Sequence, residues 1–379
     1  MLTIGIPQLY CGASGKKGAY NRQEIGLARA FAALGCRAVV LYPALPGTAP
    51  AAEDLEPNVR VLTLPARRWR VHAFYQSWQP LLDEGVNAVH VMGDTSLGVP
   101  GLYRFCQKNN IFFYSQLGAL QSAAENPLAR AVMDLLAKPT LAVYRRSTVF
   151  AKTPAVAAQL AARRIACAGV MPVGLDTAII PAAAGDRAQT RAALGLSTDP
   201  NARYLLFVGR LDGYKRPLDL PPLLAALPQN WQAVVIGDGA LAGALDAALA
   251  QQGLTARCRR IPALGNAAVQ GYYHACDVFI NLNDQEIFGM SLLEAMYAGC
   301  PPVARPAPGP DFIIENGVSG LLVDGDAAAL AAAVQRAAAD PALPNAARRR
   351  INGHFLWRSS AELALRVIPA GKDAPAQER

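Results

Sequence analysis

Short runs of β-branched and aliphatic residues alternate with longer Ala-rich amphipathic stretches along the whole chain. In the first half we expect strands at residues 2–7, 36–43, 59–65, 88–93 and 111–116. Between the first two runs, residues 24–34 have helical spacing. In the second half we expect strands at residues 204–209, 232–237, 258–264, 277–282 and 301–306. Parallel strands need crossover connections, so this alternation predicts two α/β, Rossmann-like domains.

Glycine and proline cluster at residues 169–181, where the hydrophobic periodicity is lost. This favours a linker. We therefore expect a first domain over residues 1–170 and a second over residues 171–352. Residues 353–368 predict a terminal helix, and residues 369–379 predict a flexible tail.

The net charge of +8 is unevenly distributed. Residues 1–170 hold 18 Lys and Arg against 9 Asp and Glu, a balance of +9, and the remainder holds 18 against 19, or −1. The excess indicates an anionic partner for the first half, namely a membrane surface, a phosphorylated acceptor or nucleic acid. A solvated Arg-rich surface explains it equally well.

The cysteines and histidines do not predict a metal centre or a disulfide framework. The seven cysteines are scattered without a C-x-x-C, and four histidines are spread over the chain. No apolar run approaches the ~18 to 20 residues of a spanning helix, and no basic region precedes the first apolar run. We therefore expect a cytoplasmic protein.

Two cations follow the predicted strand at residues 204–209. Gly209 ends this strand in FVGRLDGYKRPLDL, with Arg210 and Lys215 before a predicted helix. Ligands of open parallel sheets bind at the carboxyl ends of strands, and a helix start there suits phosphate. Arg210 can hold a diphosphate as a fork and Lys215 as a point charge. Taken alone, the segment also fits an ordinary exposed loop.

The segment EIFGMSLLE places two carboxylates, Glu286 and Glu294, eight positions apart. On one continuous helix they would differ by about 80° of rotation and would not share a face. Gly289 favours a loop that carries Glu286, followed by a helix that starts near Met290 or Ser291. Such a start presents unpaired N–H groups to a ligand. The alternative is a helix-capping carboxylate plus a surface one.

Together with VVIGDG at residues 234–239 and QGYYHACDVFINL at residues 270–282, these segments resemble the retaining glycosyltransferases of family 4. That family has the GT-B fold and a signature of Glu, seven residues, Glu. The resemblance extends from about residue 1 to residue 367 and is densest in the second half. It implies two Rossmann-like domains with parallel sheets facing across a cleft. The helix over residues 353–368 would cross back to the first, acceptor-binding domain, and the second domain would bind a nucleotide sugar.

The resemblance also implies roles for individual residues. Glu286 would face the donor sugar, Glu294 would bind the ribose hydroxyls, and the backbone near Ile261 to Gly265 would hold the nucleobase. The expected donor-binding residues are Gly209, Arg210, Lys215, Ile261, Leu264, Glu286, Phe288, Gly289, Met290, Ser291 and Glu294. As catalytic residues we expect Glu286 and the two cations, which would stabilise the diphosphate leaving group. We expect front-face attack without a covalent intermediate, no metal and no cofactor.

The glycine-rich segment CGASGKKGAYNRQE does not fit a P-loop, which needs four residues between its glycines and a Ser or Thr after the Lys. In the related enzymes a loop after the first strand lies against the donor phosphates and the acceptor. Gly18 matches its position. Lys16 and Lys17 are candidates for contact with an anionic acceptor, and a solvated loop is the alternative.

Two positions depart from the pattern of the family. Gln116, in FFYSQLGAL, lies where a histidine commonly contacts the hydroxymethyl group of the sugar, and Val173 lies where asparagine is usual. Gln116 retains hydrogen-bonding capacity, so we expect sugar contact with an altered donor preference. His90, at the end of a preceding strand, is a further candidate, with a structural role as the alternative.

A membrane surface is the remaining candidate partner. PARRWRVHAFYQSW mixes basic and aromatic residues, and PLARAVMDLLAKPTLAVYRR adds basic residues around an apolar helix. The basic and aromatic residues concerned are Arg67, Arg68, Trp69, Arg70, Phe74, Trp78, Arg130, Lys138, Arg145 and Arg146. Many relatives glycosylate lipids, so we expect peripheral attachment at the inner face of the membrane. Core helices with Arg-rich exposed faces are the alternative.

The leading hypothesis is a retaining hexosyltransferase of cell-envelope glycan biosynthesis. It would use a UDP or GDP sugar and a lipid-linked or anionic glycan acceptor, and no nucleic acid. One alternative is an inactive nucleotide-sugar-binding scaffold, supported by Gln116 and Val173. Others are a nucleotide-sugar epimerase, which needs acid and base groups around the sugar, and a phosphorylase, which needs free phosphate. Fold alone does not separate them.

Overall fold

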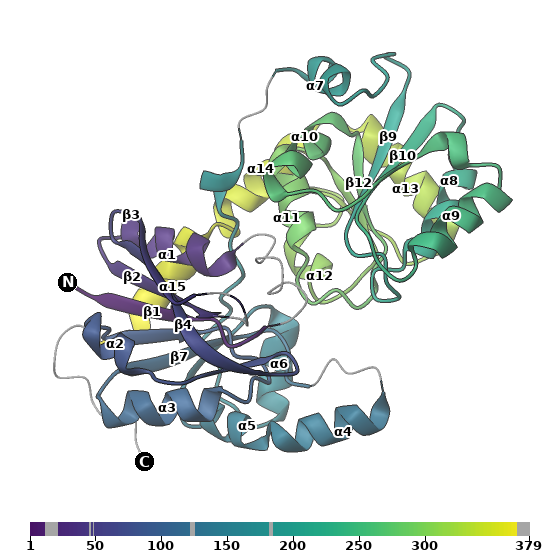
Figure 1. Cartoon of the computed structure of the whole chain (residues 1–379). Coiled ribbons are helices and arrows are strands. Elements are labelled where there is room, and N and C mark those ends of the chain that lie inside the picture. The colour runs from purple at the N-terminus through teal and green to yellow at the C-terminus, as the bar shows by residue number, and fades with distance from the viewer. Residues whose placement is uncertain (12–21, 45–46, 48, 122–125, 182–184, 370–379) are drawn as a thin grey trace. The chain divides into compact units, whose positions relative to one another are not determined.

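The computed structural model describes residues 1–11, 22–44, 47, 49–121, 126–181 and 185–369. The chain divides into two compact units (Figure 1). Unit 1 comprises residues 1–176 and 357–379, and unit 2 comprises residues 177–356. Each unit is an α/β domain built on a sheet whose strands are mostly parallel, as the alternation in the sequence predicts.

Unit 1 contains an eight-stranded sheet in the order β3-β4-β2-β1-β6-β7-β8, with β5 paired to β4. Its strands are β1 (Thr3–Pro7), β2 (Arg37–Ala44), β3 (Ala51–Glu56), β4 (Val59–Trp69), β5 (His72–Tyr75), β6 (Ala88–Val91), β7 (Phe112–Leu117) and β8 (Thr148–Ala151). Its helices are α1 (Gln23–Ala33), α2 (Gln79–Asp83), α3 (Val99–Lys108), α4 (Pro127–Leu136), α5 (Lys138–Tyr144), α6 (Pro154–Ala162) and α15 (Trp357–Val367). All five residues of the central strand β1 are buried, as in a parallel strand covered on both faces.

Three strands of unit 1 escape the sequence analysis. β3 is an exposed, charged edge strand, antiparallel to β4, and charged edge strands lack the alternation that marks a half-buried one. β5 forms an antiparallel pair with the end of β4, so the basic and aromatic segment is a hairpin. β8 has four residues, with Val149 to Ala151 buried, and was overlooked although the predicted strand β6 is equally short.

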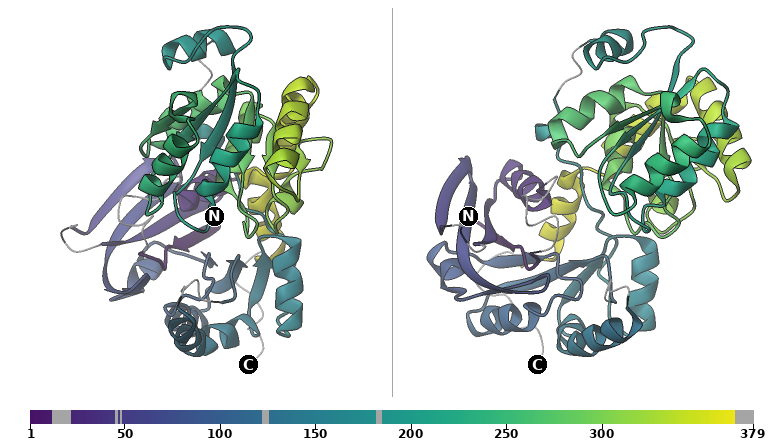
Figure 2. Two further views of the ribbon diagram at one scale, coloured as in Figure 1. Left: turned by 90° about the vertical axis from the view of Figure 1, so that its right-hand side faces the viewer. Right: turned by 45° about the vertical axis from the view of Figure 1, so that its right-hand side comes forward.

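Unit 2 contains a six-stranded sheet in the order β11-β10-β9-β12-β13-β14, with every pair parallel. Its strands are β9 (Arg203–Val208), β10 (Trp231–Ile236), β11 (Cys258–Ile261), β12 (Val278–Asn281), β13 (Pro302–Ala304) and β14 (Leu321–Leu322). Its α-helices are α7 (Arg187–Ala193), α8 (Leu220–Ala226), α9 (Ala242–Gln251), α10 (Asn266–Ala275), α11 (Met290–Ala298), α12 (Pro310–Ile313), α13 (Ala327–Ala339) and α14 (Leu343–His354). Short 3-10 turns lie at η1 (Thr177–Ile179), η2 (Pro217–Asp219) and η3 (Thr255–Arg257). Figure 2 shows the twist of this sheet and the helices on both of its faces.

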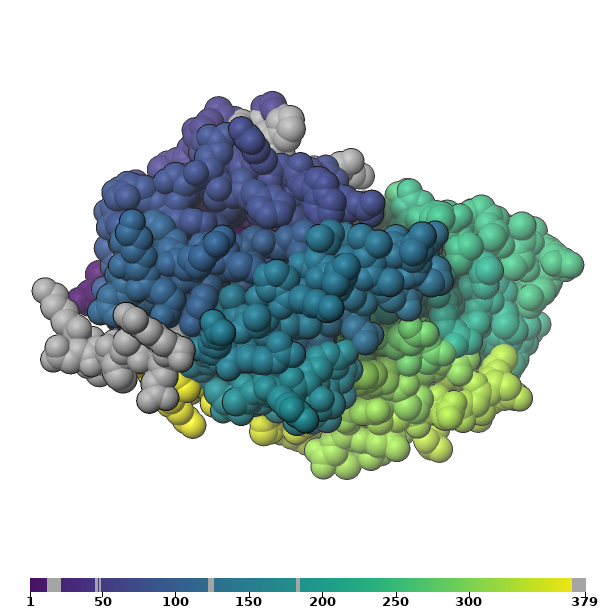
Figure 3. All heavy atoms as spheres, turned by 90° about the horizontal axis from the view of Figure 1, so that it is seen from below, coloured from purple at the N-terminus to yellow at the C-terminus, as the bar shows by residue number. Residues whose placement is uncertain are grey.

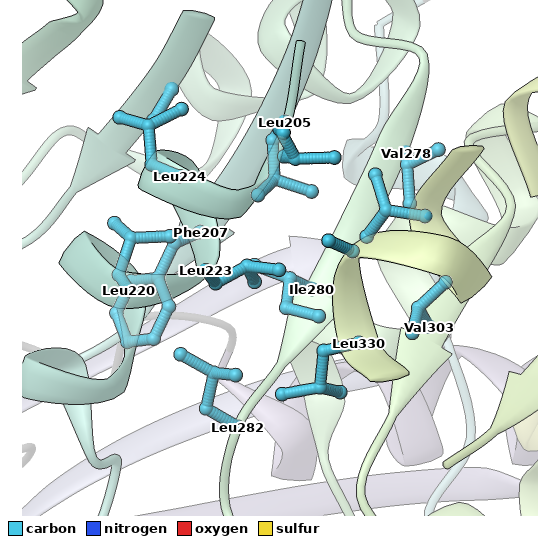
Figure 4. Packing of buried hydrophobic residues seen from close by; sticks show 14 of the residues in the cluster. Leu205, Phe207, Leu220, Leu223, Leu224, Val278, Ile280, Leu282, Val303 and Leu330 are labelled. Atoms are coloured by element: carbon cyan, nitrogen blue, oxygen red, sulfur yellow. The ribbon is translucent and has the colours of Figure 1, made fainter. Parts of the chain in front are cut away.

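Alternate residues of the central strands build the core of unit 2. Figure 4 shows side chains of β9, β12 and β13 packed against leucines of α8 and α13. The labelled residues are Leu205, Phe207, Leu220, Leu223, Leu224, Val278, Ile280, Leu282, Val303 and Leu330. Burial of these apolar side chains fixes the register of the strands, and therefore the positions at which the loops leave the sheet.

The division of the chain differs from the expected boundaries in two places. The first part of unit 1 extends to Asp176 rather than to residue 170, because residues 169–171 continue to pair with β8. The expected terminal helix over residues 353–368 is two elements. His354 ends α14, and Phe355 packs on Phe312 of unit 2 with ring centroids 5.3 Å apart. Only α15 belongs to unit 1, where it lies beside α1 (Figures 1 and 2).

No helix within the described ranges is both long enough and apolar enough to cross a membrane. All seven cysteines are free thiols.

Candidate functional site

The order of strands in unit 2 reverses between β9 and β12. The chain runs outward from β9 through β10 to β11 and then returns to the other side of β9 as β12. The carboxyl ends of strands at such a switch point are the usual ligand site of an open parallel sheet. The loop after β9 carries Arg210 and Lys215, and the loop after β12 carries Glu286. The topology therefore brings the two segments singled out in the sequence to one edge.

Glycines allow the loops after β9 and β10 to touch. Gly237 has φ 142°, and a Cβ added there would lie 1.9 Å from the carbonyl oxygen of Gly209. A Cβ added at Gly239 would lie 2.4 Å from the carbonyl oxygen of Leu211. The Leu211 N–H in turn donates to the Asp238 carbonyl at 2.9 Å. These contacts fix the turn that carries Arg210.

The two candidate cations occupy different environments. The Lys215 side chain is 19% exposed and its Nζ forms an ion pair with Oε2 of Glu286. The Arg210 side chain is 66% exposed and pairs with Oδ2 of Asp212 at 2.9 Å. Lys215 is therefore held in place at the end of the sheet, whereas Arg210 lies mostly in solvent beside Asp212.

Glu286 is held by neighbours from its own loop as well as by Lys215. Its side chain is 7% exposed, and Nδ2 of Asn283 donates to Oε2 at 3.2 Å. The Tyr214 hydroxyl donates to the Gln285 carbonyl at 3.1 Å and ties the two loops together. Burial, followed by the charge of Glu286, raises the pKa of Tyr214.

The helix after Glu286 starts where the sequence predicts. α11 begins at Met290, with Gly289 in the left-handed region at φ 98° and with no side-chain cap among the described residues. Phe288 is buried and packs on Phe355 with ring centroids 6.4 Å apart. Its backbone, rather than its ring, is therefore available to a ligand. Ser291 is half-buried in the first turn. The start of α11 retains the N–H groups that attract anions.

Glu294 lies on the next turn of α11 and is 1% exposed. Asn266 Nδ2 donates to Oε1 at 2.9 Å, and the Tyr273 hydroxyl donates to Oε2 at 2.9 Å. Burial raises the pKa of Glu294 to about 7, and the bonds from Tyr273 and Asn266 act in the opposite direction. The carboxylate is thus preorganised, with each oxygen keeping capacity for a further donor.

The sequence analysis missed Asn266 and Tyr273. Both lie on α10, seven positions apart, with Gln270 between them donating to Oδ1 of Asn266 at 3.4 Å. The spacing of 4 and then 3 places these polar residues on one face of a helix, and that signal was available in the sequence.

The residues expected near the nucleobase lie at the end of β11. Ile261 is half-buried, and its carbonyl accepts the Gly237 N–H at 3.0 Å. Leu264 is half-buried in the segment that leads into α10. α10 is the helix whose side chains hold Glu294. In the sheet, β11 is separated from β12 by β10 and β9.

The candidates in unit 1 have a different setting. Gln116 is fully buried, and its Nε2 donates to the Met171 and Pro172 carbonyls at 2.8 and 3.0 Å. His90 is fully buried on β6 with its ring edge-on to Tyr114. Burial, and to a smaller extent the charge of Lys152, lowers the pKa of His90 to about 3, and the contact with Gln116 acts in the opposite direction. His90 is therefore a neutral core residue at physiological pH.

Lys16, Lys17 and Gly18 lie outside the described residues, as does most of the expected tail. Among the described residues, no group of three or more His, Cys, Asp or Glu side chains is arranged to hold a metal ion.

Comparison with known proteins identifies the class. Residues 187–353 match the family model described as glycosyl transferases group 1. The D-inositol 3-phosphate glycosyltransferase of Geodermatophilus obscurus is 32% identical over 221 residues, which are 54% of this chain and 47% of that protein. The protein of the same name from Xylanimonas cellulosilytica is 26% identical over 368 residues, 86% of this chain and 84% of its own. The matched part spans about half the length of the first of these relatives.

Solved structures show the same fold. Sucrose-phosphate synthase from Thermosynechococcus elongatus superposes with a TM-score of 0.75 at 22% identity, covering 97% of this chain and 98% of that chain. Anabaena Alr3699/HepE in complex with UDP and glucose superposes with a TM-score of 0.71 at 19% identity, covering 97% and 99%. The chain is a GT-B protein, which confirms the predicted fold. Within this fold, unit 2 is the part of the chain that matches the glycosyl transferases group 1 family model.

Proposed function

We propose that this protein transfers a sugar from a nucleotide-diphosphate sugar to an acceptor hydroxyl, with retention at the anomeric carbon and without a metal. The observation that carries the proposal is the Lys215–Glu286 ion pair at the switch point of unit 2, beside the uncapped start of α11. A half-buried cation, a buried carboxylate and a helix start at one sheet edge suit the diphosphate and the sugar of such a donor.

Each part of the donor has a complementary group. The diphosphate accepts hydrogen bonds from the N–H groups at the start of α11, and Lys215 and Arg210 supply positive charge. The vicinal ribose hydroxyls donate to Glu294, whose two oxygens each have one protein donor. These new donors favour the ionised carboxylate, so nucleotide binding lowers the pKa of Glu294. Anabaena Alr3699/HepE has been crystallised with UDP, which makes UDP the first nucleotide to test.

In the reaction, the bond between the anomeric carbon and the diphosphate oxygen breaks and negative charge grows on the leaving group. Lys215 and Arg210 stabilise that charge. The acceptor hydroxyl attacks from the same face, and its proton passes to the departing phosphate oxygen. Glu286 is neutralised by Lys215 before the donor binds. When Lys215 turns to the phosphate, Glu286 becomes the hydrogen-bond acceptor for the sugar hydroxyls.

Calorimetry with UDP, GDP and ADP and their sugar conjugates, in the presence of a chelator, tests the donor site. We expect micromolar binding of one nucleotide, weakened at least tenfold in Glu294→Ala. Glu362→Ala is the matched control, because Glu362 is an exposed carboxylate of α15 that pairs only with Arg358 among the described residues. Absence of binding at millimolar concentration of all three nucleotides would refute the donor site.

Turnover assays with the bound donor separate the remaining functions. Release of the nucleoside diphosphate that depends on an acceptor supports the transferase. Binding without release would indicate a scaffold, and interconversion of the donor sugar without an acceptor would indicate an epimerase. The curated relatives are named for D-inositol 3-phosphate, so a phosphorylated polyol is the first acceptor to test, followed by lipid-linked glycans.

We also propose that unit 1 attaches to an anionic membrane surface through α4. This helix buries none of its residues and exposes Leu128 by 75%, Val132 by 50% and Leu135 by 58%. Their spacing places them on one face. Exposed Lys138, Arg145 and Arg146 lie on or just after α5, which follows directly. The blue and teal atoms facing the viewer in Figure 3 include this part of unit 1.

The hairpin of β4 and β5 contributes less than the sequence suggests. Trp69 is 43% exposed, but Phe74 and Trp78 are half-buried, and Trp78 packs on Tyr75 with ring centroids 4.6 Å apart. Flotation with vesicles of phosphatidylcholine alone or with phosphatidylglycerol tests the proposal. We expect binding only to the anionic vesicles and its loss in Leu128→Asp. Equal flotation of the variant and the wild type would contradict a role for α4.

A further inference from the structure

The segment at residues 169–176, here called the exit segment, leads out of unit 1 toward unit 2. It is paired to the sheet rather than loose. The Ala151 N–H donates to the Gly169 carbonyl at 3.0 Å, and the Met171 N–H donates to the Ala151 carbonyl at 2.8 Å. The exit segment therefore extends the sheet of unit 1 beyond β8, and its next residues have fixed carbonyl positions.

Gln116 uses its donor group on that segment. Its Nε2 donates to the Met171 carbonyl at 2.8 Å and to the Pro172 carbonyl at 3.0 Å. The Ser360 hydroxyl of α15 donates to the same Pro172 carbonyl at 2.7 Å. A Cβ added at Gly174 would lie 2.2 Å from the Trp357 nitrogen. β7, the exit segment and α15 are thus joined at one point.

We propose that Gln116 is a positioning residue that anchors the exit segment, and that it does not contact the donor sugar. A primary amide has two N–H bonds on one nitrogen and can reach two consecutive carbonyls, whereas the two nitrogens of an imidazole point in different directions. Histidine at this position could not make both bonds. Val173, the next residue of the exit segment, is 3% exposed and apolar, so the polar anchoring comes from β7 and α15. The consequence for catalysis rests on the proposed transferase activity, but the anchoring does not.

Hydrogen exchange of the full chain, read by mass spectrometry, tests the anchor. Gln116→Met keeps the size of the side chain and removes the donors. We expect exchange within residues 169–176 to quicken at least tenfold, with residues 266–275 of unit 2 unchanged. Ser115→Ala is the matched control, because Ser115 is a buried neighbour on β7 whose hydroxyl has no hydrogen-bond partner among the described residues. An exchange rate in Gln116→Met equal to that of the control would overturn the proposal.

Binding separates anchoring from sugar contact. We expect Gln116→Met to leave unchanged the ratio of affinities for the nucleotide sugar and for the free nucleotide. A tenfold fall in that ratio would place Gln116 on the sugar and overturn the proposal. If Gln116→Met does not fold, Ser360→Ala removes the other donor to Pro172 and should quicken exchange in the same segment. If the wild type binds no nucleotide, the proposed function fails, while the exchange experiment still decides on the anchor.

Discussion

The buried carboxylate Glu294 should make unit 2 less stable as the pH rises. Burial raises its pKa from 4.5 to about 7 in the folded protein. The folded state therefore holds the proton more tightly than the unfolded state does. The stabilisation from this group is fully present below pH 4.5, is lost as the pH rises toward 7, and does not change further above that. A shift of this size corresponds to about 3 kcal/mol at 1.36 kcal/mol per pKa unit.

Glu294→Gln removes the titration with little change of shape. The amide oxygen can accept from Asn266, and the amide nitrogen can donate to the Tyr273 hydroxyl, which is able to accept. In urea unfolding, the free energy of unfolding of the wild type minus that of the variant should therefore fall by about 2.5 kcal/mol between pH 5 and pH 8, since part of the stabilisation is already lost at pH 5. Other titrating groups are common to both proteins and cancel in the difference.

Tyr273→Phe gives a second reading of the same effect. It removes a hydrogen bond that lowers the pKa of Glu294, so the loss of stability should extend to higher pH than in the wild type. The Glu294 variants should also bind nucleotide more weakly. Parallel stability profiles for the wild type and Glu294→Gln would refute the reasoning, because they would show that Glu294 titrates equally in the folded and unfolded states.

Two further predictions concern the loops after β9 and β10. Lys215→Met should lower kcat by about 10²- to 10³-fold, near 3 kcal/mol, because it removes a preorganised cation from the leaving group; steady-state kinetics with saturating donor will measure this, and an unchanged kcat would exclude Lys215 from the chemical step. Gly237→Ala should destabilise unit 2 by about 2 kcal/mol or more, because its φ of 142° and the 1.9 Å approach to Gly209 both oppose a Cβ. Gly243→Ala, where a Cβ meets nothing within 4 Å, is the control for thermal unfolding and should be neutral or stabilising.

Much of the fold was predictable because the hydrophobic periodicity is strong. Ten expected strands correspond to strands in the structure, and the helix at residues 24–34 corresponds to α1. The strands that were missed, β3, β5, β8 and β14, are short, exposed or at an edge. β3 has no buried side chain and β14 has only two residues, so neither gives a strand pattern. β5 and β8 are four-residue runs with three buried side chains each, and they were overlooked between polar segments.

The sequence by itself predicted that Arg210 and Lys215 follow one buried strand and that Glu286 lies in a loop before a helix, because apolar runs and glycines mark these ends. It also predicted that a helix starts near Met290, directly after Gly289. The neighbouring positions of the two strands, β9 and β12, came from the tertiary structure. Only the tertiary structure decided which side chains meet there. Lys215 pairs with Glu286 across 71 positions of sequence, and Gln116 turns to the exit segment. Each pairing depends on how far apart two loops lie, and packing of the core of that unit sets this distance. Local spacing in the sequence does not encode it.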